Sequence, residues 1–210
     1  MTAAIAGYRT AILALLADAS KIIFTDNDVD QALRWALSEY SLHRPLIRTY
    51  DFDVLGTTAI HTMPADFVTH QITKVELWNS DPDSVTELSF YAYRPDEQWV
   101  INTRYQVGTG EILTVYYSAV HTVDSLDSAS GTTVPAADET LLQVGAAGRA
   151  ASMRAMNRVE NIGMNPNEVQ SYRQIAADYL SHFALLLSID AGASVGLPDF
   201  PGDIPSKLVF

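Results

Sequence analysis

The stretch TDNDVDQALRWALSEYSLHRP, residues 25–45, decides the fold, because it is the clearest helix in the chain. Thr25 or Asp26 can cap its start, where backbone N–H groups lack partners within the helix. Pro45 biases the residue before it away from helical geometry, so we expect the helix to end at or just before His43. The chain then enters a region of different composition.

This helix carries two apolar faces. A period of 3.6 residues places one set of side chains on a single arc, which predicts the face that packs into a helical core: Val29, Leu33, Ala36, Leu37 and Tyr40. Trp35 and Leu42 lie together on the other side. A second apolar patch needs a second partner, which is either the chain's own β region or another subunit.

The acidic residues at the start of the helix resemble the beginning of a calcium-binding loop. Asp26, Asp28 and Asp30 have the EF-hand spacing, but Gln31 stands where that loop requires Gly and Leu37 where it requires Glu. We therefore exclude calcium. Capping and the favourable potential at a helix N-terminus explain these carboxylates.

Composition bounds the class of protein. The chain has 210 residues, enough for one core or for one core with a small insert. Its 25 acidic and 13 basic residues give a formal charge of −12, which argues against a dedicated nucleic-acid binder, since phosphates require clustered Lys and Arg. It contains no cysteine, which excludes disulfides and thiol chemistry.

The N-terminal apolar run is interpreted as an amphipathic helix over residues 2–18. Residues 2–17 lack the basic n-region of a signal peptide, and Arg9 interrupts the run. No window approaches the ~18 to 20 apolar residues that a membrane-spanning helix needs. We expect a soluble protein that is made in the cytoplasm and has no membrane partner.

Between the second and third helices, β-branched and aromatic residues replace Ala and Leu. Short turn signals divide this region, residues 46–121, into six predicted strands. The strands are Ile47–Val54, Thr58–Met63, Ile72–Trp78, Val85–Tyr93, Gln98–Arg104 and Glu111–Ala119. Short strands in sequence order suggest an antiparallel meander or a small sandwich.

Residues 122–133, rich in Ser, Asp, Thr and Gly, are predicted to form a loop. The third helix begins near Pro135, and its glycines indicate close approach by a neighbouring helix. Its basic residues form the chain's only local basic cluster: Arg149, Arg154 and Arg158.

The fourth helix ends in an apolar segment that indicates burial on several sides. Residues 191–210 contain three prolines and are expected to be extended.

The predicted fold class is α+β: a four-helix bundle with an antiparallel β meander or small sandwich inserted between helices two and three, plus an extended C-terminal tail. The helical bundle comprises residues 1–45 and 134–190. The β insert comprises residues 46–121, the loop residues 122–133 and the tail residues 191–210.

No stretch of the sequence carries a catalytic or cofactor signature. The Walker loop, the dinucleotide-binding glycine motif and the nucleophile elbow are all missing. The histidines lack the spacings of metal ligands: His43, His61, His70, His121 and His182. We therefore expect no enzymatic activity, no cofactor and no metal.

The predicted order of helix, helix, β insert, helix, helix and extended tail, together with several short sequence segments, resembles the head-to-tail adaptor (connector) proteins of tailed bacteriophages. The segments are ALRWALSEYSLHRP at 32–45, MPADF at 63–67 with IxKVE at 72–76, VYYSAVH at 115–121 and TTVPAADETLL at 132–142. Together they span about residues 20 to 160 of the chain.

The resemblance implies a structural virion protein at the neck. Such a protein forms a ring of about twelve subunits, beneath the portal and above a downstream neck or tail protein. DNA would pass its acidic lumen without specific binding, since carboxylates repel phosphates. The candidate subunit or portal contacts are Trp35, Leu42, Leu185, Ile189, Leu197, Phe200, Leu208, Val209 and Phe210. A head-closure or tail-completion protein is the alternative within this class, and a small enzyme or ligand-binding module is the alternative outside it.

Overall fold

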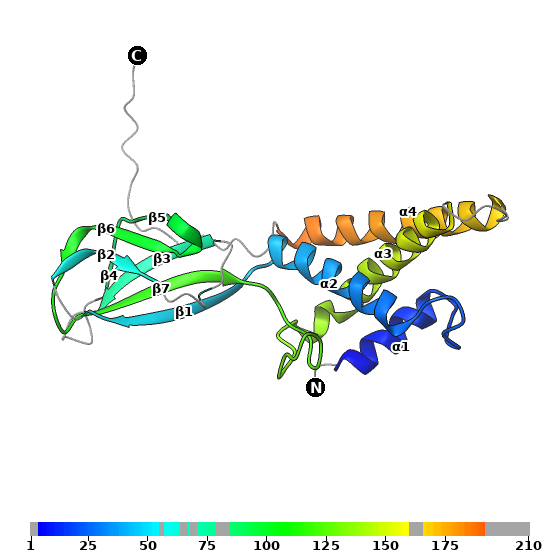
Figure 1. The fold of residues 1–210 in the computed structure, drawn as a ribbon, viewed down its shortest axis with the longest axis horizontal. Helices are drawn as coiled ribbons and strands as arrows, with labels where there is room; N and C mark the ends of the chain where they lie inside the picture. Colours follow the sequence, from blue (N-terminus) through cyan, green and yellow to red (C-terminus); the bar gives the residue numbers. More distant parts are fainter. Residues whose placement is uncertain are drawn as a thin grey trace, which may run out of the picture.

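The computed structural model describes residues 4–54, 57–63, 67, 71–78, 85–159 and 166–191. Figure 1 shows an elongated molecule, with the helices at one end and the strands at the other. We call these two ends the helical part and the β part. The four α-helices are α1 (Ile5–Leu15), α2 (Asp26–His43), α3 (Glu139–Val159) and α4 (Pro166–Ala191).

The predicted start and end of α2 are confirmed. The Thr25 hydroxyl oxygen accepts a hydrogen bond from the Asp28 N–H at 3.3 Å, and the Asp28 carboxylate accepts one from the Thr25 N–H at 2.9 Å. This reciprocal capping box satisfies two backbone donors. The helix ends at His43, two residues before Pro45.

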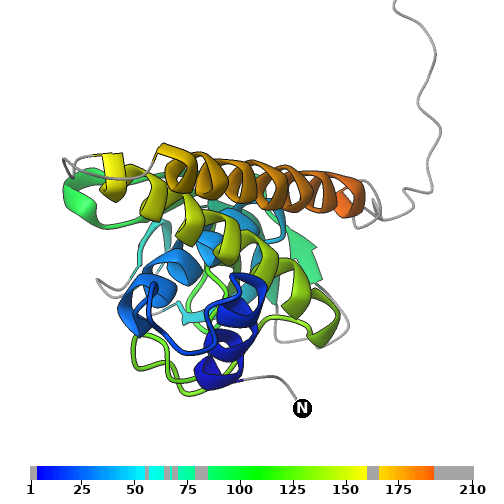
Figure 2. The ribbon, with the colours of Figure 1, turned by 90° about the vertical axis from the view of Figure 1, so that its right-hand side faces the viewer.

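The helical part is not the predicted four-helix bundle, and α3 is its central element. α3 packs against α1, α2 and α4, and Figure 2 shows it between α4 above and α1 below. Small side chains on several sides of α3 make this possible, since they let three helices approach one axis. The most buried of them are Ala146, Ala147, Ala150 and Ala151.

The glycines of α3 confirm the predicted close approach of a neighbouring helix. A Cβ atom at Gly148 would lie 3.0 Å from the backbone nitrogen of Leu180 in α4. One at Gly145 would lie 2.7 Å from the Phe183 ring. The distance at Gly145 is shorter than real Cβ contacts, and the distance at Gly148 is tighter than most of them, so the lack of a side chain at both positions allows α3 and α4 to pack this closely.

The predicted meander is wrong, because the strands form two antiparallel sheets with non-sequential order. The orders are β1-β7-β3-β4 and β2-β6-β5. The strands are β1 (Leu46–Asp53), β2 (Thr58–Thr62), β3 (Gln71–Trp78), β4 (Val85–Glu87), β5 (Tyr91–Tyr93), β6 (Val100–Val107) and β7 (Ile112–Ala119). The single strand predicted over Val85–Tyr93 is two strands, which belong to different sheets.

The pairing of β1 with β7 explains why the order is not sequential. These are the strands that leave and re-enter the helical part, and they pair from Leu46↔Ala119 to Asp53↔Ile112. The two ends of the insert therefore meet beside the helices. Short-range alternation in a sequence does not encode such a long-range pair.

The inner faces of the two sheets enclose a second core, separate from the helical one. Ile101 and Val107 from the smaller sheet, Met63 just after β2, and Val75 and Leu113 from the larger sheet are fully buried there. The outer faces of both sheets therefore point away from this core.

Candidate interaction surfaces

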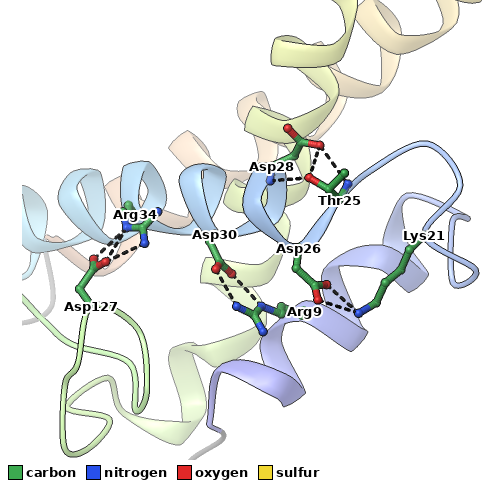
Figure 3. Close-up of polar contacts among 8 residues, drawn as sticks. All are labelled: Arg9, Lys21, Thr25, Asp26, Asp28, Asp30, Arg34 and Asp127. Carbon is green, nitrogen blue, oxygen red and sulfur yellow. Dashed lines mark hydrogen bonds and ion pairs between the residues drawn. The ribbon is translucent and has the colours of Figure 1, made fainter.

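The three carboxylates at the start of α2 each have a separate partner (Figure 3). Asp26 pairs with Lys21 at 2.7 Å, and Asp30 accepts two hydrogen bonds from Arg9 at 2.8 and 2.7 Å. Asp28 belongs to the capping box with Thr25. These contacts tie α1 and the following loop to α2. Among the described residues, no three His, Asp or Glu side chains gather as metal ligands would.

A groove of about 300 Å³ runs between α2 and the loop that follows β7. Leu37, Val123 and Leu126 form its apolar floor, and the ion pair between Arg34 and Asp127, 2.6 Å long, stands at its rim. The lowered pKa of the Asp127 carboxyl is due to the hydrogen bonds from Arg34. The charges at the rim are thus paired with each other.

Trp35 packs against α4 of its own chain, a partner that the sequence interpretation did not include. Its ring lies 6.0 Å from the Phe183 ring, centroid to centroid, and the Arg149 guanidinium lies 5.4 Å above it. Both contacts are favourable for an indole face. The ring is only partly buried, so its remaining surface is still a candidate contact.

The other contacts predicted in the helical part are exposed where they can be observed. Leu42 in α2 is 60% exposed and Leu185 in α4 is 57% exposed. The Ile189 side chain lies outside the described residues, as do the predicted tail contacts Leu197, Phe200, Leu208, Val209 and Phe210. The structure therefore places Leu42 and Leu185 at the surface and does not place the tail.

The predicted basic cluster on α3 is divided between two environments. Arg149 covers Trp35, as described above, whereas the charge of Arg154 acts on Asp18 in the loop after α1. Burial opposes the ionisation of Asp18, but hydrogen bonds from the N–H groups of the next turn outweigh it and lower the pKa of the carboxyl. The side chain of Arg158 lies outside the described residues.

A buried polar cluster joins the helical part to the β part. The Asp138 carboxylate, just before α3, accepts a hydrogen bond from the Tyr40 hydroxyl at 2.5 Å and pairs with Arg44 at 2.8 Å. His121, just after β7, donates its backbone N–H to the Ser41 hydroxyl at 2.9 Å. The end of α2 is thereby fastened to both later segments of the chain.

The ring of His121 completes this junction as a neutral group. Its Nε2 lies 3.0 Å from the Arg44 carbonyl oxygen, and its Nδ1 lies 3.2 Å from both the carbonyl oxygen and the hydroxyl oxygen of Thr133. The ring can therefore donate to either carbonyl, whereas Nδ1 can accept a hydrogen bond only from the Thr133 hydroxyl. Burial lowers the pKa of His121, which favours this neutral form.

The outer face of the larger sheet is polar in its middle and apolar at its far end. In the middle, the Glu76 carboxylate pairs with Lys74 and accepts a hydrogen bond from the Tyr116 hydroxyl at 2.6 Å. At the end far from the helices, Val85, Trp78 and Ile112 stand opposite one another on three adjacent strands. All three are partly exposed apolar side chains.

The outer face of the smaller sheet carries two exposed tyrosines. Tyr91 and Tyr93 lie two residues apart on β5, and their rings stack at 5.8 Å. The sequence analysis did not select them, because the face that a strand exposes depends on its partners. The alternation Tyr-Ala-Tyr is the local signal that could have indicated a surface here.

In the described part of the chain, no helix combines the length and apolarity required to cross a membrane.

The chain matches no known protein-family model, and no curated protein matches it either. Among solved structures, it is similar to a chain from the neck of an empty GTA particle computed with C6 symmetry. The two share 13% sequence identity, over 82% of this chain and 93% of that one, with a TM-score of 0.31. A TM-score this low does not establish a common fold.

Proposed function

We propose that this chain is a structural virion protein, a head-to-tail adaptor that forms a ring beneath the portal and extends the DNA channel towards the tail. The observation that carries the proposal is the presence of exposed apolar side chains on both parts of the molecule. Leu42 and Leu185 lie on the helical part, and Trp78 and Ile112 lie on the β part. A ring needs two different complementary patches on each subunit. In this proposal the patch on the helical part of one subunit contacts the patch on the β part of the next.

Two features of the sequence support this function. A formal charge of −12 suits a channel through which DNA passes without sticking, because the phosphates are repelled. The sequence segments that resemble adaptor proteins include residues 32–45 at the end of α2, where Leu42 is exposed. In this proposal the portal and a downstream neck or tail protein bind the two ends of the ring, and the tail contacts the portal or a neighbouring subunit.

One observation favours a different class of function. The groove beside α2 has about 300 Å³ of space and an apolar floor next to His121, which would suit a small ligand. A ligand-binding module is therefore the second candidate. It predicts a compact monomer, whereas an adaptor predicts assembly with a portal.

The proposal is tested by mixing the purified chain with a portal protein encoded in the same genome. We expect ring-shaped particles in negative-stain images and a mass many times 23.0 kDa by light scattering. The free chain is not informative, since assembly can require the portal. A mixture that remains monomeric, with saturable small-molecule binding in the groove, would contradict the adaptor function.

A pair of variants locates the contact. Leu42→Asp places a charge in an exposed apolar position and should weaken ring formation while leaving the melting temperature unchanged. Ile22→Asp, at a position that is 83% exposed and lies outside the predicted contacts, is the control and should assemble normally. Equal assembly of both variants would remove α2 from the interface.

A further inference from the structure

The outer face of the smaller sheet is an uncharged surface with a defined set of side chains. The register places Ile60, Asn102 and Tyr91 in one row across β2, β6 and β5. Thr62, Val100 and Tyr93 form the next row. We call these six residues the tyrosine face. Their neighbours His61, Ile101 and Ala92 point to the opposite side, towards the core between the sheets.

Most of the tyrosine face is exposed although it is largely apolar; its buried member is Val100, which lies between Thr62 and Tyr93. Ile60 is 53% exposed, Tyr91 50% and Tyr93 40%. None of its six side chains carries a charge, in a chain whose formal charge is −12. An exposed apolar surface without charges indicates a binding site for another apolar segment.

The hydrogen bonding of Tyr91 leaves a donor directed outwards. The side-chain amide of Asn102 donates to the Tyr91 hydroxyl oxygen at 3.1 Å. The hydroxyl hydrogen is therefore available to an acceptor beyond the protein surface. Stacked tyrosines with hydroxyl donors bind polyproline II segments, whose prolines pack between aromatic rings and whose carbonyl groups remain free to accept.

The chain itself contains a segment of this kind shortly after α4. The sequence LPDFPGDIP, residues 197–205, has Pro198 and Pro201 three residues apart. A polyproline II helix has three residues per turn, so this spacing places both rings on one edge. Leu197 and Phe200 share the second edge, and Asp199 and Pro205 fall on the third. Two edges are thus apolar and the third can face water.

The described structure ends at residue 191, close enough to the β part for the segment to be considered as a ligand of the tyrosine face. α4 ends at Ala191, and that end of the helix is the one beside the β part (Figure 1). β5 and α4 both lie on the upper side of the molecule in that view. Residues 197–201 follow Ala191 after about 6 to 10 positions of the chain. A polyproline II chain covers about 3.1 Å per residue, so the segment can reach roughly 20 to 30 Å from Ala191.

We propose that in the free chain residues 197–201 dock as a polyproline II segment on the tyrosine face of the same molecule. Pro198 and Pro201 pack against the stacked rings of Tyr91 and Tyr93, and Tyr91 donates its free hydroxyl hydrogen to a backbone carbonyl of the segment. Because no charged group takes part on the sheet, docking is insensitive to salt. The inference does not depend on the proposed ring.

The test uses the full-length protein, which has no native cysteine to interfere with labelling. Asp199→Cys places a nitroxide spin label on the edge of the segment that faces water. We expect the NMR signals of Tyr91, Tyr93 and Ile60 to lose intensity when the label is oxidised and to recover when it is reduced. The signals of Ile22, which lies just before α2 and thus at the end of that helix opposite to β1, should keep their intensity.

Proline variants supply matched controls in the labelled protein. Replacement of Pro198 and Pro201 by Ala should restore the signals of the tyrosine face, because the apolar edge and the polyproline II preference are lost. Pro205→Ala changes a proline on the third edge and should leave the broadening intact. Broadening that survives the first replacement would overturn the proposed role of the prolines.

Two further outcomes would overturn the proposal. The tyrosine face is not the docking site if the label broadens the signals of residues that line the groove beside α2. The same holds if the label broadens no signal of the β part. A mixture of isotope-labelled chain with spin-labelled chain of natural isotopic abundance detects binding between molecules. Broadening of the tyrosine face in that mixture, equal to that within one chain, would assign the segment to a second copy instead.

Discussion

The helical part and the β part treat their apolar side chains differently. In the helices, large side chains such as Tyr8, Ile12 and Leu33 are fully buried, and ion pairs such as that of Arg9 with Asp30 link one element to the next. In the β part, one small core lies between two sheets whose outer faces retain exposed Trp78 and Tyr91. The helical part is thus built around one core, with Leu42 and Leu185 exposed on its surface, whereas the β part presents two outer faces.

The largest losses of stability should come from removing a large side chain from either hydrophobic core. Leu33→Ala in the helical core and Ile101→Ala in the β core each remove a fully buried side chain, which costs about 2 to 5 kcal/mol of unfolding free energy. Chemical denaturation followed by tryptophan fluorescence and by circular dichroism measures both. Because the junction at Tyr40, Arg44 and Asp138 couples the parts, we expect one transition in each variant. Two separate transitions would show that the parts unfold independently.

A smaller loss is expected where α3 meets α4. Gly148→Ala introduces a Cβ atom 3.0 Å from the backbone nitrogen of Leu180, and such overpacking costs about 1 to 3 kcal/mol. Gly131→Ala is the matched control, because nothing lies within 4 Å of its added Cβ. Thermal unfolding compares the two. An equally stable Gly148→Ala variant would mean that α4 can shift without cost.

Mild acid should weaken both parts through one histidine in each. Burial lowers the pKa of His121 at the junction and of His61 in the β core below the ordinary 6.5. The unfolded chain then binds protons at higher pH than the folded one, so the free energy of unfolding falls as pH decreases below about 6.5. The carboxyls with lowered pKa contribute only below their ordinary values of 3.8 to 4.5.

The two histidines can be separated by substitution. His121→Gln and His61→Gln should each reduce the slope of stability against pH between about 6.5 and 4.5, as measured by urea denaturation. The unsubstituted chain, measured under the same conditions, gives the full slope for comparison. An unchanged slope in both buried variants would contradict the neutral state inferred for these rings.

The smallest effect is expected at the rim of the groove. Arg34→Ala removes the ion pair with Asp127, in which both side chains are largely exposed, and surface pairs contribute about 0 to 1 kcal/mol. The loss of melting temperature should be slight and should vanish at high salt. A loss comparable to that of Leu33→Ala would show that the loop after β7 is part of the scaffold.

Local chemistry made some elements predictable and others not. The cap at Thr25, the stop before Pro45 and the close approach at Gly148 each depend on neighbouring residues or on a missing side chain, and the structure confirms them. The partner of Trp35, the splitting of Val85–Tyr93 and the tyrosine face were not predicted. Each depends on which distant segment lies opposite, and periodicity contains no information on that.

The sequence by itself determined where the helices lie and how α2 begins and ends, because capping, proline geometry and the 3.6-residue period act within a few residues. Only the tertiary structure decided that α3 is central and that β1 pairs with β7 across the whole insert. The same long-range pairing sets which face of each sheet is exposed. A one-residue change of register would exchange the core face for the surface, so the interaction surfaces follow from the fold as a whole.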